Sequence, residues 1–369
     1  MGVALDYLIV AAVSFGTVVA GTPIVAYVCR RVGAVAVPGE RSIHRFPVPT
    51  LGGLAIFGGL IAAFGAGSAL PAFAEVFQFT SEPEAIVLAM MVIVVVGVID
   101  DTRGLSAPAK VAGQVLAAGI LTLFGIVLQY VYVPGVGAYS LVGSEITPLI
   151  TILLLVAIMN AINLVDGLDG LAAGIVAIAA AALFVYTVTT QAAQSPSAGP
   201  LLLAGIVGAC LGFLVHNFNP ASIFMGDTGA MLLGLVLGSS GISAVGRQYS
   251  PDAGSFAAAA VPVLVPILVL AVPFLDVAWA VIRRVARGQA PFSPDKQHIH
   301  HQLLAWAHSQ RRAVLIMYYF SGLLAFAAVG GGLVDRYVLL GVLGAGLGLA
   351  ILTWAGGRIA RRIAELRAR

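Results

Sequence analysis

The chemistry of this chain is concentrated in a few polar segments between long apolar runs. The first segment is VIVVVGVIDDTRGL, residues 92–105, which ends in the adjacent pair Asp100 and Asp101. Neighbouring carboxylates repel one another, and burial raises the pKa of one of them unless a cation compensates. Lys110 and Arg103 stand close by, so a bound phosphate or divalent cation would account for the group. A solvated acidic pair at a helix end is the alternative.

The second segment is NAINLVDGLDGLAAG, where Asn160, Asn163, Asp166 and Asp169 recur at every third residue. At about 100° per residue, the two asparagines share one face of a helix, and the adjoining loop adds two carboxylates. An all-oxygen set of this kind suits Mg2+, which takes few protein ligands besides substrate phosphates. Mn2+ is the alternative metal, since it favours the same donors. Helix caps and turns would explain only one or two of the four positions.

The third segment, FMGDTGA, places Asp227 at the expected start of a helix. An ordinary N-cap is one interpretation. Helix N-termini also attract anions, so an aspartate there competes with phosphate unless a metal bridges the two. Phe224 could stack on a nucleobase, although packing against lipid or core is the more ordinary role of a phenylalanine.

The fourth segment, SPDKQHIHHQLL, carries His298, His300 and His301 beside Lys296. The spacing is not a common zinc pattern, and no cysteine accompanies it. We expect these histidines to contact phosphate or to donate hydrogen bonds to a pyrophosphate. A solvated surface cluster is the alternative.

The elements that must position these segments are membrane helices. Of the 369 residues, 60% are hydrophobic and 9% are charged, whereas soluble domains carry roughly 25% charged residues. Apolar runs near 20 residues recur throughout, which predicts an all-α, polytopic integral membrane protein with a single domain over 1–369. The net charge of +3 gives no support for nucleic-acid binding, and two cysteines give none for a disulfide framework.

Glycine, proline and charge divide the chain into about eleven transmembrane helices. The expected spans are 5–28, 51–70, 85–99, 109–129, 147–163, 170–189, 200–216, 229–246, 258–283, 313–331 and 336–355. Of 19 Lys and Arg residues, 17 fall in the odd-numbered loops or the C-terminal tail, and only Arg247 and Arg336 fall opposite. This asymmetry predicts cytoplasmic odd loops and C-terminus, with the N-terminus outside. The segment 130–142 predicts a small hairpin on the outer face.

Together the motifs resemble the polyprenyl-phosphate N-acetylhexosamine-1-phosphate transferase superfamily of integral membrane enzymes. The match runs in the family's order, through PVPTLGG, IDDTRGL, NAINLVDGLDGLAAG, FMGDTG and HIHHQLL. The His-Ile-His-His sequence at 298–301 is similar to the bacterial branch that uses UDP-N-acetylglucosamine (UDP-GlcNAc). The branch that transfers phospho-N-acetylmuramoyl-pentapeptide instead has three contiguous histidines followed by Phe-Glu.

The resemblance implies a reaction and its partners. UDP-GlcNAc and a polyprenyl phosphate, undecaprenyl or decaprenyl, would give polyprenyl-pyrophosphoryl-GlcNAc and UMP with Mg2+. This would be the first lipid-linked step of cell-envelope glycan synthesis. The enzyme would lie among the lipids of the bacterial cytoplasmic membrane with its active site facing the cytoplasm. Related enzymes are often dimers, so a homodimer is expected.

Residue roles are implied by the same resemblance. Asp227 matches a Mg2+ ligand, and Asn163 matches a second contact to the metal. Positions of the nucleotide pocket, with its uracil and base-stacking contacts, correspond to Asn160, Asp169, Asn217 and Phe224. Positions of the catalytic loops, including the contacts to sugar and pyrophosphate, correspond to Asp166, His298, His300 and His301.

The acceptor side is implied in the same way. Asp100 and Asp101 match the pair proposed to engage the lipid phosphate, with Lys110 beside them. The first-loop segment near the acceptor corresponds to Arg45, Thr50 and Gly52. This chain departs from the family where Phe46 follows Arg45, because relatives often have two basic residues there.

Direct attack by the lipid phosphate is the favoured mechanism, and a covalent phosphoryl-aspartate intermediate is the alternative. Which aspartate of the pair takes a proton stays open. Another UDP-N-acetylhexosamine or the pentapeptide donor is the alternative specificity. An ion-coupled transporter would place ionisable groups near mid-membrane and would show an internal repeat, and neither pattern dominates this sequence.

Overall fold

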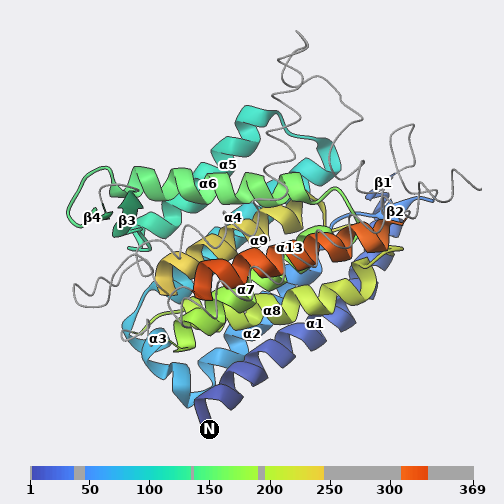
Figure 1. Ribbon diagram of the computed structural model, residues 1–369. Coiled ribbons are helices and arrows are strands. Elements are labelled where there is room, and N and C mark those ends of the chain that lie inside the picture. Colours follow the sequence, from blue (N-terminus) through green and yellow to red (C-terminus); the bar gives the residue numbers. More distant parts are fainter. Residues whose placement is uncertain (1, 37–45, 134–136, 190–195, 245–308, 331–369) are drawn as a thin grey trace, which may run out of the picture.

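The computed structural model describes residues 2–36, 46–133, 137–189, 196–244 and 309–330. Helices dominate this part of the chain (Figure 1). Their bounds are α1 Gly2–Val32, α2 Gly53–Ser68, α3 Ala74–Phe79, α4 Glu82–Arg103, α5 Ala107–Leu123, α6 Thr147–Val165, α7 Leu171–Thr189, α8 Gly199–Asn217, α9 Gly226–Ala244 and α13 Gln310–Gly330, with a 3-10 turn, η1, at Pro71–Phe73.

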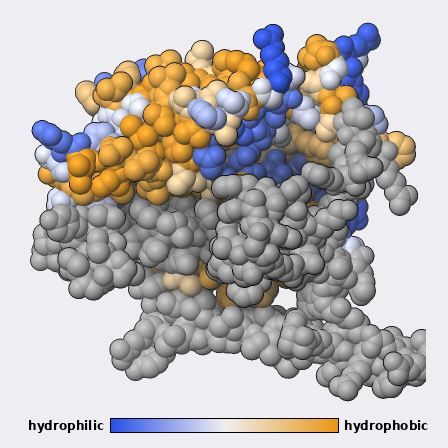
Figure 2. Space-filling view, turned by 90° about the horizontal axis from the view of Figure 1, so that it is seen from above, coloured by the Kyte–Doolittle hydropathy of each residue, from blue (hydrophilic) through white to orange (hydrophobic). Residues whose placement is uncertain are grey.

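Several of these helices have the length and composition of membrane spans. Five of them, α1, α4, α6, α7 and α8, pass on both criteria within the described residues, and a sixth is added if α2 and the segment Pro71–Phe79, bent by 94°, count as one. Figure 2 shows apolar residues over much of the described face. Large apolar side chains of α5 and α6, among them Leu116, Leu149 and Leu153, are exposed. The predicted membrane class is therefore confirmed. Spans 258–283 and 336–355 lie outside the described residues, so the count of eleven and the orientation stay predictions.

Helix α9 is the central element of the bundle. Every residue from Thr228 to Ala244 is buried, and α2, α4, α6 and α8 pack around it (Figure 1). Small residues permit the close approach, as is common between membrane helices. A Cβ built at Gly53 of α2 would lie 2.2 Å from the Gly229 nitrogen, and one at Gly97 of α4 would lie 2.4 Å from the Thr228 Cα. The backbones of α2 and α4 thus touch the first turn of α9.

Several helix ends differ from the sequence prediction, among them the C-terminal ends of α4 and α5. Helix α4 continues beyond residue 99 to Arg103, so Asp100 and Asp101 belong to its last turn and not to a loop. It ends where Gly104 adopts a φ of 71° and donates its N–H to the Asp100 carbonyl at 2.8 Å. Helix α5 ends at Leu123 and not at 129, because Gly125 adopts a φ of 83° and turns the chain away. Both ends follow from the ease with which glycine enters positive φ.

Two small hairpins accompany the helices. Strands β3 (Tyr130–Val133) and β4 (Gly137–Ser140) pair antiparallel, with Tyr130 opposite Ser140, which confirms the hairpin predicted at 130–142. A second pair, β1 (Val35–Ala36) and β2 (Val48–Pro49), was not predicted. Its strands are too short for an alternating pattern to reveal them.

The helices alternate so that the polar segments meet at one end of the bundle. The C-terminal ends of α1, α4, α6 and α8 gather there with the N-terminal ends of α2, α5, α7 and α9 (Figure 1). Backbone bonds join the segment before α2 to the segment before α9, because the Gly52 and Gly53 N–H groups donate to the Phe224 and Met225 carbonyls at 3.0 and 2.9 Å. The hairpin β3–β4 and the start of α4 lie at the other end.

A buried carboxylate, Glu82, links three helices at the end of the bundle opposite to the polar segments. Glu82 is 2% exposed, and its Oε2 accepts the backbone N–H of Ala198 at 2.8 Å and the Ser243 hydroxyl at 2.6 Å. These bonds connect the start of α4 to the start of α8 and the end of α9. A helix N-terminus favours a negative charge, so the position of Glu82 at the start of α8 is favourable.

We expect Glu82→Ala to destabilise the protein by about 1–3 kcal/mol, because Ala198 N–H and the Ser243 hydroxyl lose a buried acceptor. Glu82→Gln keeps an oxygen that can accept both bonds and should lose much less. Thermal unfolding in detergent measures the difference. Equal losses in the two variants would contradict this role of the side-chain oxygen.

Candidate active site

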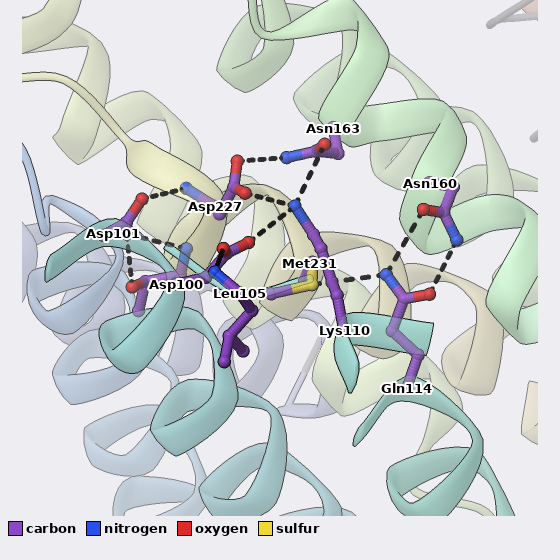
Figure 3. Close-up of polar contacts among 10 residues, drawn as sticks. Asp100, Asp101, Leu105, Lys110, Gln114, Asn160, Asn163, Asp227 and Met231 are labelled. Carbon is purple, nitrogen blue, oxygen red and sulfur yellow. Dashed lines mark hydrogen bonds and ion pairs between the residues drawn. The ribbon is translucent and has the colours of Figure 1, made fainter. Parts of the chain in front are cut away.

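Four side chains from four helices converge where the polar segments meet (Figure 3). The ammonium of Lys110 on α5 pairs with Asp100 of α4 at 2.9 Å and with Asp227 of α9. It also donates to Asn163 Oδ1 of α6 at 3.5 Å, while Asn163 Nδ2 donates to Asp227 Oδ1 at 2.6 Å. Among the three charged side chains, Asp227 is 34% exposed, and Lys110 and Asp100 are largely withdrawn from solvent. The sequence predicted all four as site residues, and the structure brings them together.

A second polar contact lies one turn deeper between α5 and α6. Gln114 follows Lys110 by one turn, and Asn160 precedes Asn163 by one turn, so the two pairs stack along the helix interface. Asn160 Nδ2 donates to Gln114 Oε1 at 2.7 Å, and Gln114 Nε2 donates to Asn160 Oδ1 at 3.4 Å (Figure 3). Asn160 therefore fastens α6 to α5. Gln114 was not identified from the sequence, although a buried glutamine within an apolar helix is a recognisable signal.

The two adjacent aspartates do different things. Asp101 accepts the backbone N–H groups of Asp227 and Thr228 at 2.8 and 3.0 Å and the Thr228 hydroxyl at 2.6 Å. It thereby satisfies the exposed N–H groups that begin α9. A Cβ at Gly226, whose φ is 71°, would lie 2.5 Å from Asp101 Oδ2, so only glycine fits against this carboxylate. Asp100 instead pairs with Lys110 and accepts the Leu105 N–H at 2.7 Å.

Acidic groups crowd this end of the bundle. Burial raises the pKa of Asp166 to about 7, with further contributions from the negative charges of Asp227, Asp101 and Asp169. Each of these carboxylates makes it harder for its neighbours to ionise, and a cation relieves that repulsion. The region therefore favours binding of positive charge.

The donor set fits Mg2+. Asp100, Asp227 and Asn163 all direct oxygen atoms at the Lys110 ammonium, and Mg2+ prefers oxygen ligands of this kind. Within the described ranges, no group of three or more His, Cys, Asp or Glu residues could hold a metal by itself. A metal bound here would need additional ligands, which agrees with the preference of Mg2+ for phosphate and water oxygens.

The loops after α6 and α8 are bound to each other. Asn217 is 3% exposed; its Oδ1 accepts the Gly170 N–H at 3.0 Å and its Nδ2 donates to the Ile223 carbonyl at 2.9 Å. Asp169 Oδ2 accepts the Ala221 N–H at 3.1 Å and Asn219 Nδ2 at 2.8 Å. Asn217 and Asp169 thus hold the two loops in a fixed relation. Asn219 was not identified from the sequence, where it reads as an ordinary residue before proline.

The segment PVPTLGG, residues 47–53, supports the backbone around Phe224. The Phe224 N–H donates to the Pro49 carbonyl at 2.8 Å, and a Cβ at Gly52 would lie 2.5 Å from the Phe224 carbonyl oxygen. The Thr50 hydroxyl donates to the Ala34 carbonyl at 3.2 Å and so joins this segment to the end of α1.

The remaining expectations have mixed outcomes. Three of the four residues spaced by three contact different partners: Asn160 faces Gln114, Asn163 faces Asp227, and Asp169 binds the loop after α8. Helix α6 ends at Val165, so both asparagines lie on the helix and both aspartates lie beyond it, as the sequence predicted. A shared metal stays a prediction. Residues that lie outside the described ranges are Arg45, His298, His300 and His301.

The part of the chain that forms this site is similar to known proteins. Residues 84–245, which include the four converging side chains, match the family described as glycosyl transferase family 4. The decaprenyl-phosphate N-acetylglucosaminephosphotransferase of Mycolicibacterium smegmatis is 40% identical over 332 residues, 87% of this chain and 81% of the relative. The probable undecaprenyl-phosphate N-acetylglucosaminyl 1-phosphate transferase of Bacillus subtilis is 35% identical, over 86% and 82%. The phospho-N-acetylmuramoyl-pentapeptide-transferase of Moorella thermoacetica is 32% identical, over 88% and 98%.

The different bonds of Asp100 and Asp101 lead to a test by substitution. Asp101→Ala should lower the free energy of unfolding by about 1–3 kcal/mol, because buried N–H donors at the start of α9 lose their acceptor. Asp100→Ala should cost less, because Lys110 keeps Asp227 and Asn163 as partners. Chemical denaturation of the two purified variants in detergent measures both values, and a larger loss for Asp100→Ala would refute the assignment.

Proposed function

We propose, from the premise that the chain belongs to glycosyl transferase family 4, that it transfers N-acetylglucosamine 1-phosphate to a polyprenyl phosphate. The relatives of 40% and 35% identity are both named for this transfer, and the chain covers more than four fifths of each. UDP-GlcNAc is the proposed donor, with UMP as the second product. The convergence of Lys110, Asp100, Asn163 and Asp227 carries the proposal within the molecule.

The chemistry requires positioning and neutralisation of charge above all. The reaction breaks the pyrophosphate bond that joins GlcNAc 1-phosphate to UMP and forms a pyrophosphate bond to the lipid phosphate. Its transition state spreads negative charge over the phosphoryl oxygens. Lys110 supplies a fixed positive charge, held between Asp100 and Asp227. A preorganised charge in a site withdrawn from water stabilises such a transition state more strongly than it would in water.

Mg2+ is the proposed metal, held by Asp227 and Asn163 with Asp100 nearby; Mn2+ is the alternative. When bound, it would offset the charge of the pyrophosphate. Asn163 already orients Asp227 by donating to its Oδ1. Asp166, whose pKa is raised to about 7 by burial and by its acidic neighbours, would be favoured in its ionised form by a nearby cation.

Asp100 is the better candidate to meet the acceptor phosphate. The carboxylate of Asp101 is committed to three donors at the start of α9, whereas Asp100 lies beside the Lys110 ammonium. A phosphate monoester has a second pKa of about 6, so its last proton is easily lost near neutral pH. We propose that the lipid phosphate attacks the donor directly. A phosphoryl-aspartate intermediate is the alternative.

The cellular setting follows from the same proposal. The enzyme would work in the bacterial cytoplasmic membrane with the site on the cytoplasmic side, where sugar nucleotides are available. The acceptor would be a decaprenyl or undecaprenyl phosphate from the surrounding lipid, and a homodimer is the proposed assembly. His298, His300 and His301 are proposed to contact the sugar and pyrophosphate.

A second candidate function is transfer of phospho-N-acetylmuramoyl-pentapeptide. The Moorella thermoacetica relative named for that transfer is 32% identical. Two observations favour UDP-GlcNAc over it, namely the higher identity to the relatives named for N-acetylglucosamine and the His-Ile-His-His sequence at 298–301.

A donor panel tests the proposed function. Purified protein with Mg2+ and decaprenyl phosphate should release UMP from UDP-GlcNAc, and little from UDP-N-acetylmuramoyl-pentapeptide. Release of UMP is followed by chromatography, and the lipid product by mass spectrometry. Turnover of the pentapeptide donor alone would establish the second candidate, and no release from any of these donors would reject the family reaction.

Substitution of Asp227 tests the metal proposal. Asp227→Asn removes a charge that neutralises Lys110 and would bind Mg2+, so we expect turnover to fall by about 10²-fold or more. Glu84→Gln, at the start of α4 and therefore at the opposite end of the bundle, removes the same charge and should keep normal turnover. Both variants should show wild-type unfolding temperatures within a few degrees. Near-normal turnover of Asp227→Asn would remove Asp227 from the site.

A further inference from the structure

Helix α13 is bound to the same end of the bundle by polar contacts that the proposed mechanism does not use. It lies beside α7 (Figure 1), and its Tyr318 hydroxyl donates to the Gly170 carbonyl in the loop after α6. A Cβ built at Gly174 would lie 2.0 Å from the Tyr318 ring, so this glycine makes room for the tyrosine. Tyr318 thus fixes α13 against the start of α7.

The first turn of α13 holds the loop after α8 through Asn219. The Asn219 amide nitrogen donates to Asp169 Oδ2 and to Gln310 Oε1, both at 2.8 Å. An amide NH2 group has two hydrogens, and here both are used. Asn219 therefore bridges the loop after α6 and α13, segments that are far apart in the sequence.

Arg311 adds a third connection to the same residue. Its Nε donates to the backbone carbonyl of Asn219 at 2.6 Å. Because Gln310 and Arg311 are the first two residues of α13, the side chain and the backbone of Asn219 are both bound by one helical turn. Arg312 follows directly with an exposed side chain, and its backbone N–H bonds Ser309 Oγ at 3.3 Å.

The loop that α13 holds and the loop that faces it carry two residues expected in the nucleotide pocket, Phe224 and Asp169. Residues 218–225 carry Phe224, and Asp169 lies in the facing loop. The charged centre, which is formed by Lys110, Asp100, Asp227 and Asn163, is anchored separately. Lys110 and Asp100 belong to α5 and α4. The side chain of Asp227 is held by Asn163, and its backbone N–H is bound by Asp101 of α4. A loosened Asn219 would therefore disturb the two loops and leave the charged centre in place.

We propose that the first turn of α13 braces the loops after α6 and α8, which carry the expected nucleotide-pocket residues. Gln310 and Arg311 are then positioning residues for binding of the sugar nucleotide. This inference rests on the proposed function for the identity of the ligand. The brace itself rests on the contacts of Asn219 alone. Loss of the brace raises the KM for UDP-GlcNAc and leaves kcat largely unchanged, since the reacting groups keep their own anchors.

Hydrogen–deuterium exchange tests the brace without substrate. In the full-length protein, Arg311→Ala and Gln310→Ala should raise amide exchange of residues 218–225 by about threefold to tenfold, the factor expected for loss of one hydrogen bond. Arg312→Ala is the matched control, because it removes the same charge from the same turn and leaves Asn219 bound. Unchanged exchange in Arg311→Ala and Gln310→Ala, or an equal rise in Arg312→Ala, would overturn the brace.

Steady-state kinetics test its role in donor binding. Arg311→Ala should raise the KM for UDP-GlcNAc about threefold to tenfold with kcat within a factor of two, and Arg312→Ala should match the wild type. A fall of kcat at constant KM would overturn the positioning role, and so would wild-type kinetics. If the wild-type protein released no UMP from UDP-GlcNAc, the proposed function would fail, while the exchange experiment would still decide on the brace.

Discussion

Carboxylates at the end of an apolar bundle need positive partners, and the structure supplies two kinds within a few residues of each other. The N–H groups at the start of α9 are bound by Asp101, and the ammonium of Lys110 is bound by Asp100 and Asp227. A helix N-terminus carries only a partial positive charge, whereas the ammonium carries a full one. The adjacent aspartates therefore make different contributions, one to the position of α9 and one to the charge of the site.

Close packing turns these local bonds into a fixed geometry. Helix α9 touches α2 and α4 at glycine contacts, and α4 binds it at both ends, through Asp101 at its start and Glu82 at its end. Membrane helices gain little from the hydrophobic effect among themselves, so small residues and polar bonds decide how they associate. The glycine contacts and the polar bonds of α9 together fix the position of Asp227 in its first turn.

The molecule separates the charged centre from the loops beside it. Asp100, Lys110 and Asn163 come from regular helices, and Gln114 with Asn160 continues their interface one turn deeper. The loops after α6 and α8 are held by Asn217, Asp169 and Asn219 and by the first turn of α13. This separation suits the proposed reaction. The reacting phosphates need charges held in a rigid arrangement, which the helices provide, and the rest of the donor is recognised by loops.

The sequence by itself determined the membrane class, the approximate helices and the residue types of the site, because apolar runs and polar breaks are properties of a local stretch of chain. Polar residues in an apolar chain have few ordinary roles, and with the resemblance to the transferase superfamily this predicted Asp100, Lys110, Asn163 and Asp227 as site residues. The sequence did not indicate which of these residues bind one another. Only the tertiary structure decided that Asp101 binds α9, that Asn160 pairs with Gln114, and that Gln310 and Arg311 reach Asn219. Each of these bonds joins residues from 46 to 126 positions apart, and the distance between such residues depends on how the helices pack, which no local pattern records.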